Sequence, residues 1–485
     1  MTVHLVGAGP GDPGLITVRG AELLARADVV VHDRLSAAEL LELAPPSAIV
    51  IDVGKRAGES FTQQSINELL IEHGRSGRCV VRLKGGDPFV FARGGEEAAA
   101  LEAAGVVYEV VPGITSAIAA PTYAGIPVTL RYSSTSFTVV TGHEDPTKEF
   151  PSVNWEALAV GGGTLVILMG VAHLPEITRR LVAGGLPGST PVAAVRWGTR
   201  PNQHTVRATL DTVGDHVLAP PSVIVVGEVA REHLGWFEAK PLLGRTIVVT
   251  RARQQSGDLA RQLRELGAEV IAFPVIDVAD PSDGGAALAA AAASIGEYDW
   301  VVLTSANGAE RLLDAVGDPR RLGGVRLAVV GPMTAAVLGR RHLIADLVPG
   351  AAVAESLLAA MPAPPPGGGR VLLARAEVAR DVLPEGLATA GWAVDVVDSY
   401  RTVTASPDPS LVDAVRGADV VTFTSSSTVE RLIEIVGHDG VPPIVASIGP
   451  VTTATAVAAG LDVTIDAQVH TVAGLVAALV DWAST

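Results

Sequence analysis

The sequence is poor in the residues that build disulfides, metal sites and membrane spans. Its 485 residues include one cysteine, Cys79, which excludes a disulfide within the chain and a cysteine-rich metal site. The 11 histidines show no HExxH or other recognisable ligand spacing, so no metal is expected. Mean hydropathy is +0.37, yet no stretch approaches the roughly 18 consecutive apolar residues of a transmembrane helix. The chain starts on a strand pattern rather than a signal peptide, and we expect a soluble, cytoplasmic protein.

Aromatic and basic residues are also scarce. Aromatics make up 4% of a chain that is 48% hydrophobic, so alanine, valine and leucine must build the core, as is common in α/β proteins. Lysine and arginine total 36 against 52 aspartates and glutamates, for a formal net charge of −16. This balance argues against nucleic acid as a partner. An anionic ligand would have to meet basic residues that are concentrated locally.

Strand-like and helix-like segments alternate through the first half, as in βαβ units. Strand-like runs are predicted at 3–6, 28–31, 49–53, 79–83 and 108–111, and a second set at 137–141, 164–169, 191–195 and 223–227. The pattern predicts two α/β lobes with a ligand cleft between them. A polar stretch then reaches Pro241. We place a domain boundary there and predict domains at 1–238 and 239–485.

The second half contains an internal repeat. Segment 298–317, YDWVVLTSANGAERLLDAVG, aligns without a gap to 418–437, ADVVTFTSSSTVERLIEIVG. Further pairs are 329–336 with 447–454 and 246–252 with 370–376. A spacing of about 120 residues is too long for a solenoid, so the repeat predicts two similar α/β lobes. The segment 361–369, MPAPPPGGG, is predicted to be a connector.

Two glycine-rich turns follow strand-like runs in the first half: GAGPGDP at 7–13 and KGGDP at 84–88. Glycine permits left-handed conformations and a close approach of the backbone to a ligand, and parallel sheets place ligands at such strand ends. The first turn is not a dinucleotide loop, because Asp12 stands at the third glycine position and Pro10 and Pro13 interrupt the helix that should follow.

Seven motifs, in order, resemble the tetrapyrrole (precorrin) methylases, and within them the uroporphyrinogen-III C-methyltransferases. They are GAGPGDP at 7–13, VHDRL at 31–35, VGKRAG at 53–58, RLKGGDPFVFARGGEE at 82–97, VPGITSA at 111–117, AGIPVT at 124–129 and TGH at 141–143. The second half is similar to uroporphyrinogen-III synthase at YRT (400–402), TSSS (424–427) and IGP (448–450).

The first resemblance implies S-adenosylmethionine as the cofactor, with S-adenosylhomocysteine as its product. The family positions that hold it match Pro10, Gly85, Gly86, Asp87, Val90, Thr115, Ser116, Met169 and Gly198. Two alternatives stay open from the residues alone. Met169 could be plain core, and Thr115 with Ser116 could cap a helix.

For proton handling the resemblance points to Asp33 as acceptor and Lys55 as donor, with Arg93, Glu96 and Arg131 near the substrate. The arginines could bind carboxylates in a bidentate manner; the acids could instead form caps and surface ion pairs. The implied substrate carries eight carboxylates, and we expect the local basic residues to meet them: Lys55, Arg56, Arg82, Lys84, Arg93 and Arg131.

The second resemblance implies dehydrating closure of hydroxymethylbilane, in which the protein mainly folds the substrate and stabilises developing charge. Tyr400 is the candidate for assisting departure of the hydroxyl. Candidate substrate contacts are Ser305, Thr334, Ser425, Ser426 and Thr453. Each hydroxyl could equally cap a helix. The family also implies that the chain crosses between the two lobes twice, through a ladder near 273–278 and 394–402.

The sequence thus predicts a bifunctional α/β enzyme: a synthase that makes uroporphyrinogen III and a two-lobed methylase that converts it to precorrin-2, for sirohaem or cobalamin synthesis. The family leads us to expect a homodimer through the methylase half, with small tetrapyrroles as partners and neither nucleic acid nor membrane. One rival is a methylase of a later precorrin, fused to a tetrapyrrole-binding module that does not cyclise. Another is a pair of halves that act independently.

Overall fold

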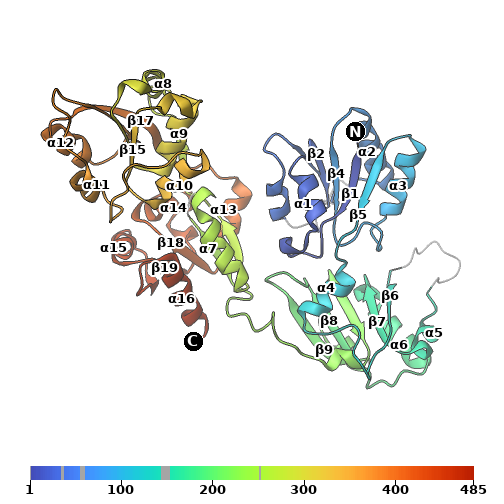
Figure 1. Ribbon diagram of the computed structural model, residues 1–485. Helices are drawn as coiled ribbons and strands as arrows, with labels where there is room; N and C mark the ends of the chain where they lie inside the picture. Colours follow the sequence, from blue (N-terminus) through green and yellow to red (C-terminus); the bar gives the residue numbers. More distant parts are fainter. Residues whose placement is uncertain (1, 34–37, 55–60, 144–152, 251–252) are drawn as a thin grey trace. The chain divides into compact units, whose positions relative to one another are not determined.

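The computed structural model describes residues 2–33, 38–54, 61–143, 153–250 and 253–485 (Figure 1). The chain divides into two compact units. The first comprises Met1–Thr246 with Arg261–Val270 and Leu479–Thr485, and the second comprises Ile247–Ala260 with Ile271–Ala478. Each unit contains two five-stranded sheets. Two strands of the second unit, β11 (Thr246–Val249) and β12 (Glu269–Ala272), begin within residues that the division assigns to the first.

The first sheet of the first unit is entirely parallel, in the order β3-β2-β4-β1-β5. Its strands are β1 (Val3–Gly7), β2 (Val29–His32), β3 (Ile49–Asp52), β4 (Val80–Lys84) and β5 (Tyr108–Val111). The connecting helices are η1 (Pro13–Leu15), α1 (Val18–Leu24), η2 (Ala38–Leu43), α2 (Gln63–Arg75) and α3 (Gly94–Ala103). One face packs on α2 and α3 and the other on α1 and η2. Because both faces are covered, β1 and β4 are buried along their whole length.

The second sheet of this unit is mixed, in the order β6-β7-β10-β8-β9, with only β6 and β7 parallel. Its strands are β6 (Phe137–Thr141), β7 (Thr164–Leu168), β8 (Pro191–Arg196), β9 (His204–Thr209) and β10 (Ser222–Val226). The helices are α4 (Ser116–Tyr123), α5 (Trp155–Gly161), η3 (Val171–His173), α6 (Leu174–Ala183), η4 (Val213–Asp215) and η5 (Glu228–Arg231). Helices α5 and α6 cover one face and α4 packs on the other.

Local sequence explains where several helices begin. Thr17, Thr62 and Thr115 stand at the N-caps of α1, α2 and α4, and each hydroxyl accepts a hydrogen bond from a backbone amide of the first turn. Asn154 caps α5 in the same way. These caps satisfy amides that have no partner within the helix. They fix the points at which the chain leaves each strand end and turns into a helix.

The second unit has two sheets that resemble one another. One has the order β12-β11-β18-β19-β20 and the other β13-β17-β16-β14-β15. The first contains β11 (Thr246–Val249), β12 (Glu269–Ala272), β18 (Val420–Phe423), β19 (Ile444–Ser447) and β20 (Val463–Asp466), with α7 (Arg253–Glu265), α13 (Pro409–Arg416), α14 (Ser426–Val436), η8 (His438–Gly440), α15 (Pro450–Ala458) and α16 (Val472–Ala483).

The other sheet contains β13 (Ile276–Ala279), β14 (Trp300–Leu303), β15 (Arg326–Val329), β16 (Arg370–Ala376) and β17 (Ala393–Thr404). Its helices are α8 (Ala286–Ala293), η6 (Ile295–Glu297), α9 (Ala306–Val316), η7 (Pro319–Leu322), α10 (Pro332–Arg340), α11 (Ala354–Ala360) and α12 (Val382–Thr389). Helices α8, α9 and α10 cover one face, and α11 and α12 cover the other. Strands β13 and β17 pair antiparallel, with Ile276 opposite Thr404. The pairing covers 276–279 and 401–404, and so overlaps in part the ladder predicted near 273–278 and 394–402.

The two repeats exchange their halves between these sheets. Strand β11, from the start of the first repeat, pairs with β18 from the second; β16, from the start of the second repeat, pairs with β14 from the first. The aligned segments correspond element by element, β14-α9-β15-α10 to β18-α14-β19-α15. Each sheet is therefore assembled from one half of each repeat.

Candidate functional site

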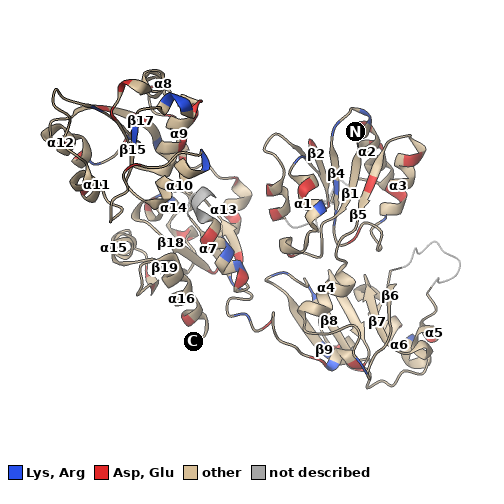
Figure 2. Ribbon diagram, viewed as in Figure 1, with Lys and Arg blue, Asp and Glu red and all other residues tan. Residues whose placement is uncertain are grey.

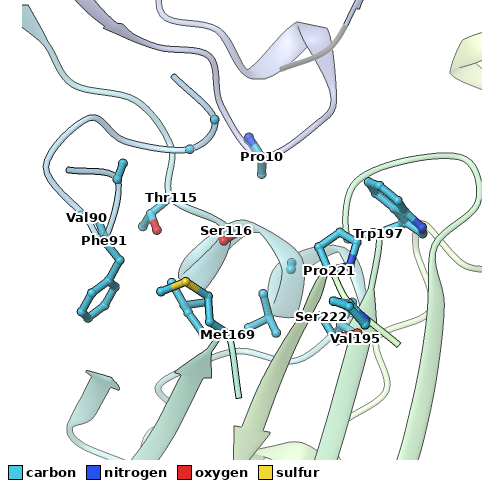
Figure 3. Close-up of a pocket in the computed structure, with 18 of the residues that line it drawn as sticks. Pro10, Val90, Phe91, Thr115, Ser116, Met169, Val195, Trp197, Pro221 and Ser222 are labelled. Atoms are coloured by element: carbon cyan, nitrogen blue, oxygen red, sulfur yellow. The ribbon is translucent and has the colours of Figure 1, made fainter. Parts of the chain in front are cut away.

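A cavity of about 710 Å³ lies within the first unit, where the loops that follow β1, β4 and β5 face the second sheet. Figure 3 shows side chains from several segments converging on it, including Pro10, Thr115, Met169 and Trp197. All nine residues predicted to hold a cofactor line this cavity: Pro10, Gly85, Gly86, Asp87, Val90, Thr115, Ser116, Met169 and Gly198. The structure thus brings together residues that the sequence spreads over nearly 190 positions.

Glycine allows the strand-end loops to pack backbone on backbone beneath the cavity. A Cβ added to Gly113 would lie 2.2 Å from the carbonyl oxygen of Gly86, and one added to Gly7 would lie 2.4 Å from the Cα of Gly113. Gly86 also has a left-handed φ of 71°. These contacts leave no room for a side chain. They bring the ends of β1, β4 and β5 close enough to form a single cavity floor.

Asp87 and Thr115 organise this floor as well as line it. The Asp87 carboxylate accepts hydrogen bonds from the amides of Phe89 (2.8 Å, to Oδ1) and Gly113 (3.0 Å, to Oδ2), tying the β4 loop to the β5 loop. The Thr115 hydroxyl accepts from the Ala117 amide and caps α4. The alternative of a helix cap is therefore confirmed for Thr115, in addition to its place on the cavity wall.

Three bulky residues on the wall adopt left-handed backbone conformations: Phe91 (φ 52°), Met169 (φ 55°) and Trp197 (φ 51°). Such conformations are uncommon outside glycine, and they persist only where the surroundings enforce them, often at ligand sites. Met169 is 51% exposed, so it is not plain core. All three line the cavity, and in Figure 3 their side chains come from different sides of it.

A cluster of charges is buried behind the wall. Arg82 donates from Nη2 to Oδ1 of Asp33 (2.7 Å), which lines the cavity, and from Nε to Oε1 of Glu97 (3.2 Å). Lys84 Nζ donates to the same Glu97 oxygen at 2.8 Å. Arg82, Lys84 and Glu97 are 2%, 2% and 0% exposed. Burial, followed by the charge of Arg82, lowers the pKa of the Lys84 ammonium.

This burial corrects one expectation. Arg82 and Lys84 were expected to meet substrate carboxylates, but both are buried in the first sheet, where carboxylates of the chain pair with them. Figure 2 marks basic residues on β4 in blue. The alternation of charged and apolar residues along β4 cannot reveal that Arg82 and Lys84 are buried, because both faces of this strand are covered. Arg93 and Arg131 remain exposed. Lys55 and Arg56 lie outside the described residues.

A second hollow adjoins the cavity and shares Phe91, His143 and Met169 with it. Arg93 and Glu96 lie on its wall and form a bidentate ion pair with both distances at 2.7 Å. The Arg93 guanidinium holds the pKa of the Glu96 carboxyl below its ordinary value. The structure thus places Asp33 in the first cavity and the Arg93–Glu96 pair in the second, and it places Arg131 on the wall of neither.

The candidate residues of the second unit stand at strand ends and helix starts. The Ser305 hydroxyl accepts from the Gly308 amide at 3.1 Å and caps α9, whereas Ser425, at the start of α14, makes no such bond and lies 3.2 Å from the Ser427 hydroxyl. Tyr400 is half-buried in β17. Thr334 is 4% exposed, so a ligand would reach it only if α10 moved.

The last two candidates of this unit lie on neighbouring helices. Ser426 begins α14, and its hydroxyl accepts a hydrogen bond from the Thr455 hydroxyl at 2.8 Å. Thr453, in α15, donates to an Asp466 carboxylate oxygen at 2.8 Å. Both side chains are therefore already engaged within the chain.

Sequence reasoning named Met169 and Gly198 from the second sheet but missed the other residues that this sheet contributes to the cavity. Trp197 and Arg200, in the turn between β8 and β9, line it, and the Arg200 guanidinium lies 5.1 Å above the Trp197 ring. Residues 220–223 at the start of β10 line it as well. The aromatic residue beside a glycine in WGTR, directly after a strand, is the signal that could have indicated them.

The described part of the chain has neither a metal-binding cluster nor a membrane-spanning helix. No group of three or more histidine, cysteine, aspartate or glutamate side chains there is arranged to hold a metal ion. Nor does any described helix combine the length and apolar character needed to cross a membrane.

Comparison with known proteins identifies the two halves. Residues 2–214 match the family Tetrapyrrole (Corrin/Porphyrin) Methylases and residues 257–477 match Uroporphyrinogen-III synthase HemD. The porphyrin biosynthesis protein HemD of Ruminiclostridium josui is 40% identical over 445 residues, which are 89% of this chain and 88% of that protein. This chain belongs to the tetrapyrrole methylases that are fused to a uroporphyrinogen-III synthase. It is a bifunctional enzyme of tetrapyrrole biosynthesis.

Other relatives match the methylase half. An S-adenosyl-L-methionine-dependent uroporphyrinogen III methyltransferase of Methanosarcina barkeri is 49% identical over 236 residues, 48% of this chain and 92% of that one. A uroporphyrinogen-III C-methyltransferase of Bacillus subtilis is 46% identical over 278 residues, 56% of this chain and 58% of that one. A solved uroporphyrin-III C-methyl transferase from Thermus thermophilus, complexed with S-adenyl homocysteine, is 39% identical, covers 48% of this chain and 99% of that one, and has a TM-score of 0.42.

Proposed function

We propose that the synthase half closes hydroxymethylbilane to uroporphyrinogen III and that the methylase half transfers two methyl groups from S-adenosylmethionine to it, giving precorrin-2. The observation that carries the proposal for the methylase is the pair of adjoining hollows. The first gathers the nine predicted cofactor residues, and the second shares Phe91, His143 and Met169 with it. Such a pair suits a methyl donor and a methyl acceptor that must meet at one boundary.

The chemistry of the cavity wall fits S-adenosylmethionine better than a nucleotide diphosphate. Much of the wall is apolar, with Val90, Leu168, Met169, Val195 and Pro221 among its residues, which suits an adenine and a sulfonium. Bound S-adenosylmethionine supplies an electrophilic methyl group. We propose that Pro10, Gly85, Gly86, Asp87, Val90, Thr115, Ser116, Met169 and Gly198 hold it.

We assign the remaining methylase residues by their chemistry. The methylated carbon itself carries no hydrogen, so charge is balanced by a proton that leaves from elsewhere on the methylated macrocycle; Asp33 accepts it, as a carboxylate on the cavity wall can. Arg93 and Glu96 contact the substrate from the second hollow, and Arg131, which is exposed, binds a substrate carboxylate. Lys55, the proposed proton donor, lies outside the described residues.

In the synthase half we propose that Tyr400 assists departure of the hydroxyl group of hydroxymethylbilane. Ser305, Ser425, Ser426, Thr453 and, after movement of α10, Thr334 contact the substrate. Loss of hydroxide leaves a delocalised cation, so positioning and charge stabilisation suffice and no strong acid or base is required. The reaction therefore suits strand ends that carry hydroxyl groups.

We further propose domain limits at 1–238 and 239–485, because the matched segments 2–214 and 257–477 fall on either side of that division. The product would serve sirohaem or cobalamin synthesis in the cytoplasm. We propose a homodimer through the methylase half, supported by apolar side chains that remain exposed there, among them Tyr132 at 95%. Size-exclusion chromatography with light scattering tests the dimer.

The decisive experiment incubates the purified chain with hydroxymethylbilane, with and without S-adenosylmethionine, and identifies products by mass and absorbance. We expect uroporphyrinogen III without the cofactor and a dimethylated product with it. Formation of the type I isomer alone would show that the bilane closed unaided and would refute the synthase assignment. Failure to methylate supplied uroporphyrinogen III would refute the methylase assignment.

A further inference from the structure

Arg82 is held more rigidly than an ordinary ion-pair partner. Its Nη1 donates to the carbonyl oxygens of Val31 (3.4 Å) and Leu83 (3.3 Å), its Nε to Glu97 and its Nη2 to Asp33. All three nitrogens of the planar guanidinium are therefore engaged. Because the guanidinium is planar and rigid, hydrogen bonds at Nε and Nη1 fix the direction in which Nη2 points. The position of Arg82 therefore determines where the Asp33 carboxylate is bound.

The register of the sheet makes this contact possible. Strands β2 and β4 are parallel neighbours, with Val31 opposite Arg82, and Asp33 follows directly after β2. Among the described residues, Arg82 is the side chain that binds the Asp33 carboxylate, and it does so at Oδ1 alone. Oδ2 of Asp33 is thus left to the cavity, whose wall includes Asp33.

The cluster behind Arg82 is not arranged for stability. Oε1 of Glu97 accepts from Arg82, Lys84 and, at 3.4 Å, Gln63, whereas Oε2 is buried without any partner among the described residues. Apolar residues of similar volume often stabilise a fold as well as a buried ion pair does, or better. A cluster that buries three charges and leaves one oxygen unsatisfied points to a task other than packing.

We propose that Arg82, oriented by Glu97 and Lys84, is a positioning residue that fixes the Asp33 carboxylate on the cavity wall during methyl transfer. The inference rests on the proposed function and on the role of Asp33 in it. Arg82 does not itself contact substrate or cofactor. It acts by presenting the free oxygen of Asp33 in one orientation, and misplacement by about 1 Å is enough to lower a rate roughly 100-fold.

The test is a mutant cycle on the full chain. The cluster variant carries Arg82→Met, Lys84→Met and Glu97→Leu together. A second variant carries Asp33→Asn, and a combined variant carries all four substitutions. We expect the cluster variant to bind S-adenosylmethionine within about threefold of wild type by calorimetry, while kcat for methylation falls roughly 10- to 100-fold. The combined variant should be no slower than Asp33→Asn alone, within about twofold, because the cluster acts through Asp33.

Losses that multiply in the combined variant, or an unchanged kcat in the cluster variant, would overturn the inference. If the cluster variant does not fold, Arg82→Lys, which keeps the charge but loses the fork, replaces it in the same cycle. Arg179→Met is the matched control, since Arg179 pairs with Glu176 on the exposed surface of α6 and should leave kcat unchanged. A wild-type chain without methyl transfer would refute the proposed function, and with it the inference that rests on it.

Discussion

The two units hold their candidate residues in opposite ways. In the methylase unit, glycine contacts and a buried charge cluster fix a cavity, and the predicted cofactor residues converge on it. In the synthase unit, the candidate hydroxyls are distributed over the starts of α9, α10, α14 and α15 and over β17. No charge cluster comparable to that around Glu97 supports them among the described residues.

The difference follows from the two reactions. Methyl transfer requires a donor and an acceptor carbon held in line, so the protein has to fix geometry before either ligand reacts. Dehydrating ring closure proceeds through a reactive cation, and the protein has only to fold a flexible substrate and stabilise charge. A rigid, preformed cavity therefore suits methyl transfer, and hydroxyl groups distributed over several helices suit ring closure. The following predictions test that contrast, beginning with the largest effect.

The methylase cavity should not tolerate a side chain at Gly113, where the loops after β1, β4 and β5 pack backbone against backbone. In Gly113→Ala the new Cβ would lie 2.2 Å from the Gly86 carbonyl oxygen, and backbone cannot yield as a flexible side chain can. We expect methyl transfer to fall below detection and the first unit to lose about 1–3 kcal/mol of stability, while ring closure continues. Gly161→Ala is the control: its Cβ would meet nothing within 4 Å, and both activities should remain. Full methylation by Gly113→Ala would show that the floor is adaptable.

The synthase should depend on single groups without losing its fold. Tyr400→Phe removes one hydroxyl from half-buried β17, and we expect the rate of uroporphyrinogen III formation to fall roughly 100-fold, as for other single donors to developing charge. The type I isomer should then accumulate, while methylation of supplied uroporphyrinogen III stays unchanged. Separation of the isomers by chromatography measures this effect. If Tyr400→Phe forms uroporphyrinogen III as fast as the wild type, the Tyr400 hydroxyl does not assist the reaction.

Equivalent serines of the two repeats should behave differently. Ser305 caps α9 through the Gly308 amide, whereas Ser425 makes no cap bond to α14. We expect Ser305→Ala to destabilise the second unit by about 1 kcal/mol, seen as a lower urea midpoint. Ser425→Ala should leave the midpoint unchanged and raise KM for hydroxymethylbilane. Equal shifts in the two midpoints would contradict the difference in capping.

The partly exposed ion pair of Arg180 with Glu156 should matter to neither reaction. Arg180 holds the pKa of Glu156 at about 2, through a bidentate pair. Because the folded pKa lies below that of the unfolded chain, the pair stabilises the first unit above about pH 4.5, and the gain disappears as pH falls toward 2. Arg180→Gln should reduce the difference in thermal stability between pH 5 and pH 3, because Arg180 is the largest cause of the lowered pKa, and should leave both rates at pH 7 unchanged. A loss of methylation would mean that the pair has a catalytic role.

Much of the fold could be predicted because hydrophobic periodicity determines it. The runs of valine and leucine at 3–6 and 164–169 became β1 and β7, with one residue difference at an end of each. Strand β9, HTVRAT, was missed because it is half-exposed at a sheet edge and carries few apolar residues. The ladder of β13 and β17 was expected only from the family resemblance, because strand pairing over more than 120 residues leaves no local signal.

The site was predictable where glycine or a motif specified it, and not where long-range contacts did. The glycine turn at 84–88 follows from backbone geometry alone. The left-handed Trp197 and the burial of Arg82 do not, because tertiary contacts impose both. A charged residue within a strand is usually assigned to a surface or a ligand, and only its neighbours Glu97 and Asp33 in space show otherwise.

The exchanged repeats have a consequence for synthesis on the ribosome. Thr250 of the β11 segment and Thr422 of β18 bond each other's strands across a separation of 172 residues. At roughly 5–20 residues per second, β11 emerges about 10–35 s before its partner strand β18 is made. The sheet that contains β14 and β16 can form in that interval. During the same interval the edge of β11 that pairs with β18 in the finished enzyme has no partner strand. Nascent chains that stop before residue 420 should therefore depend on a chaperone more than the finished enzyme does.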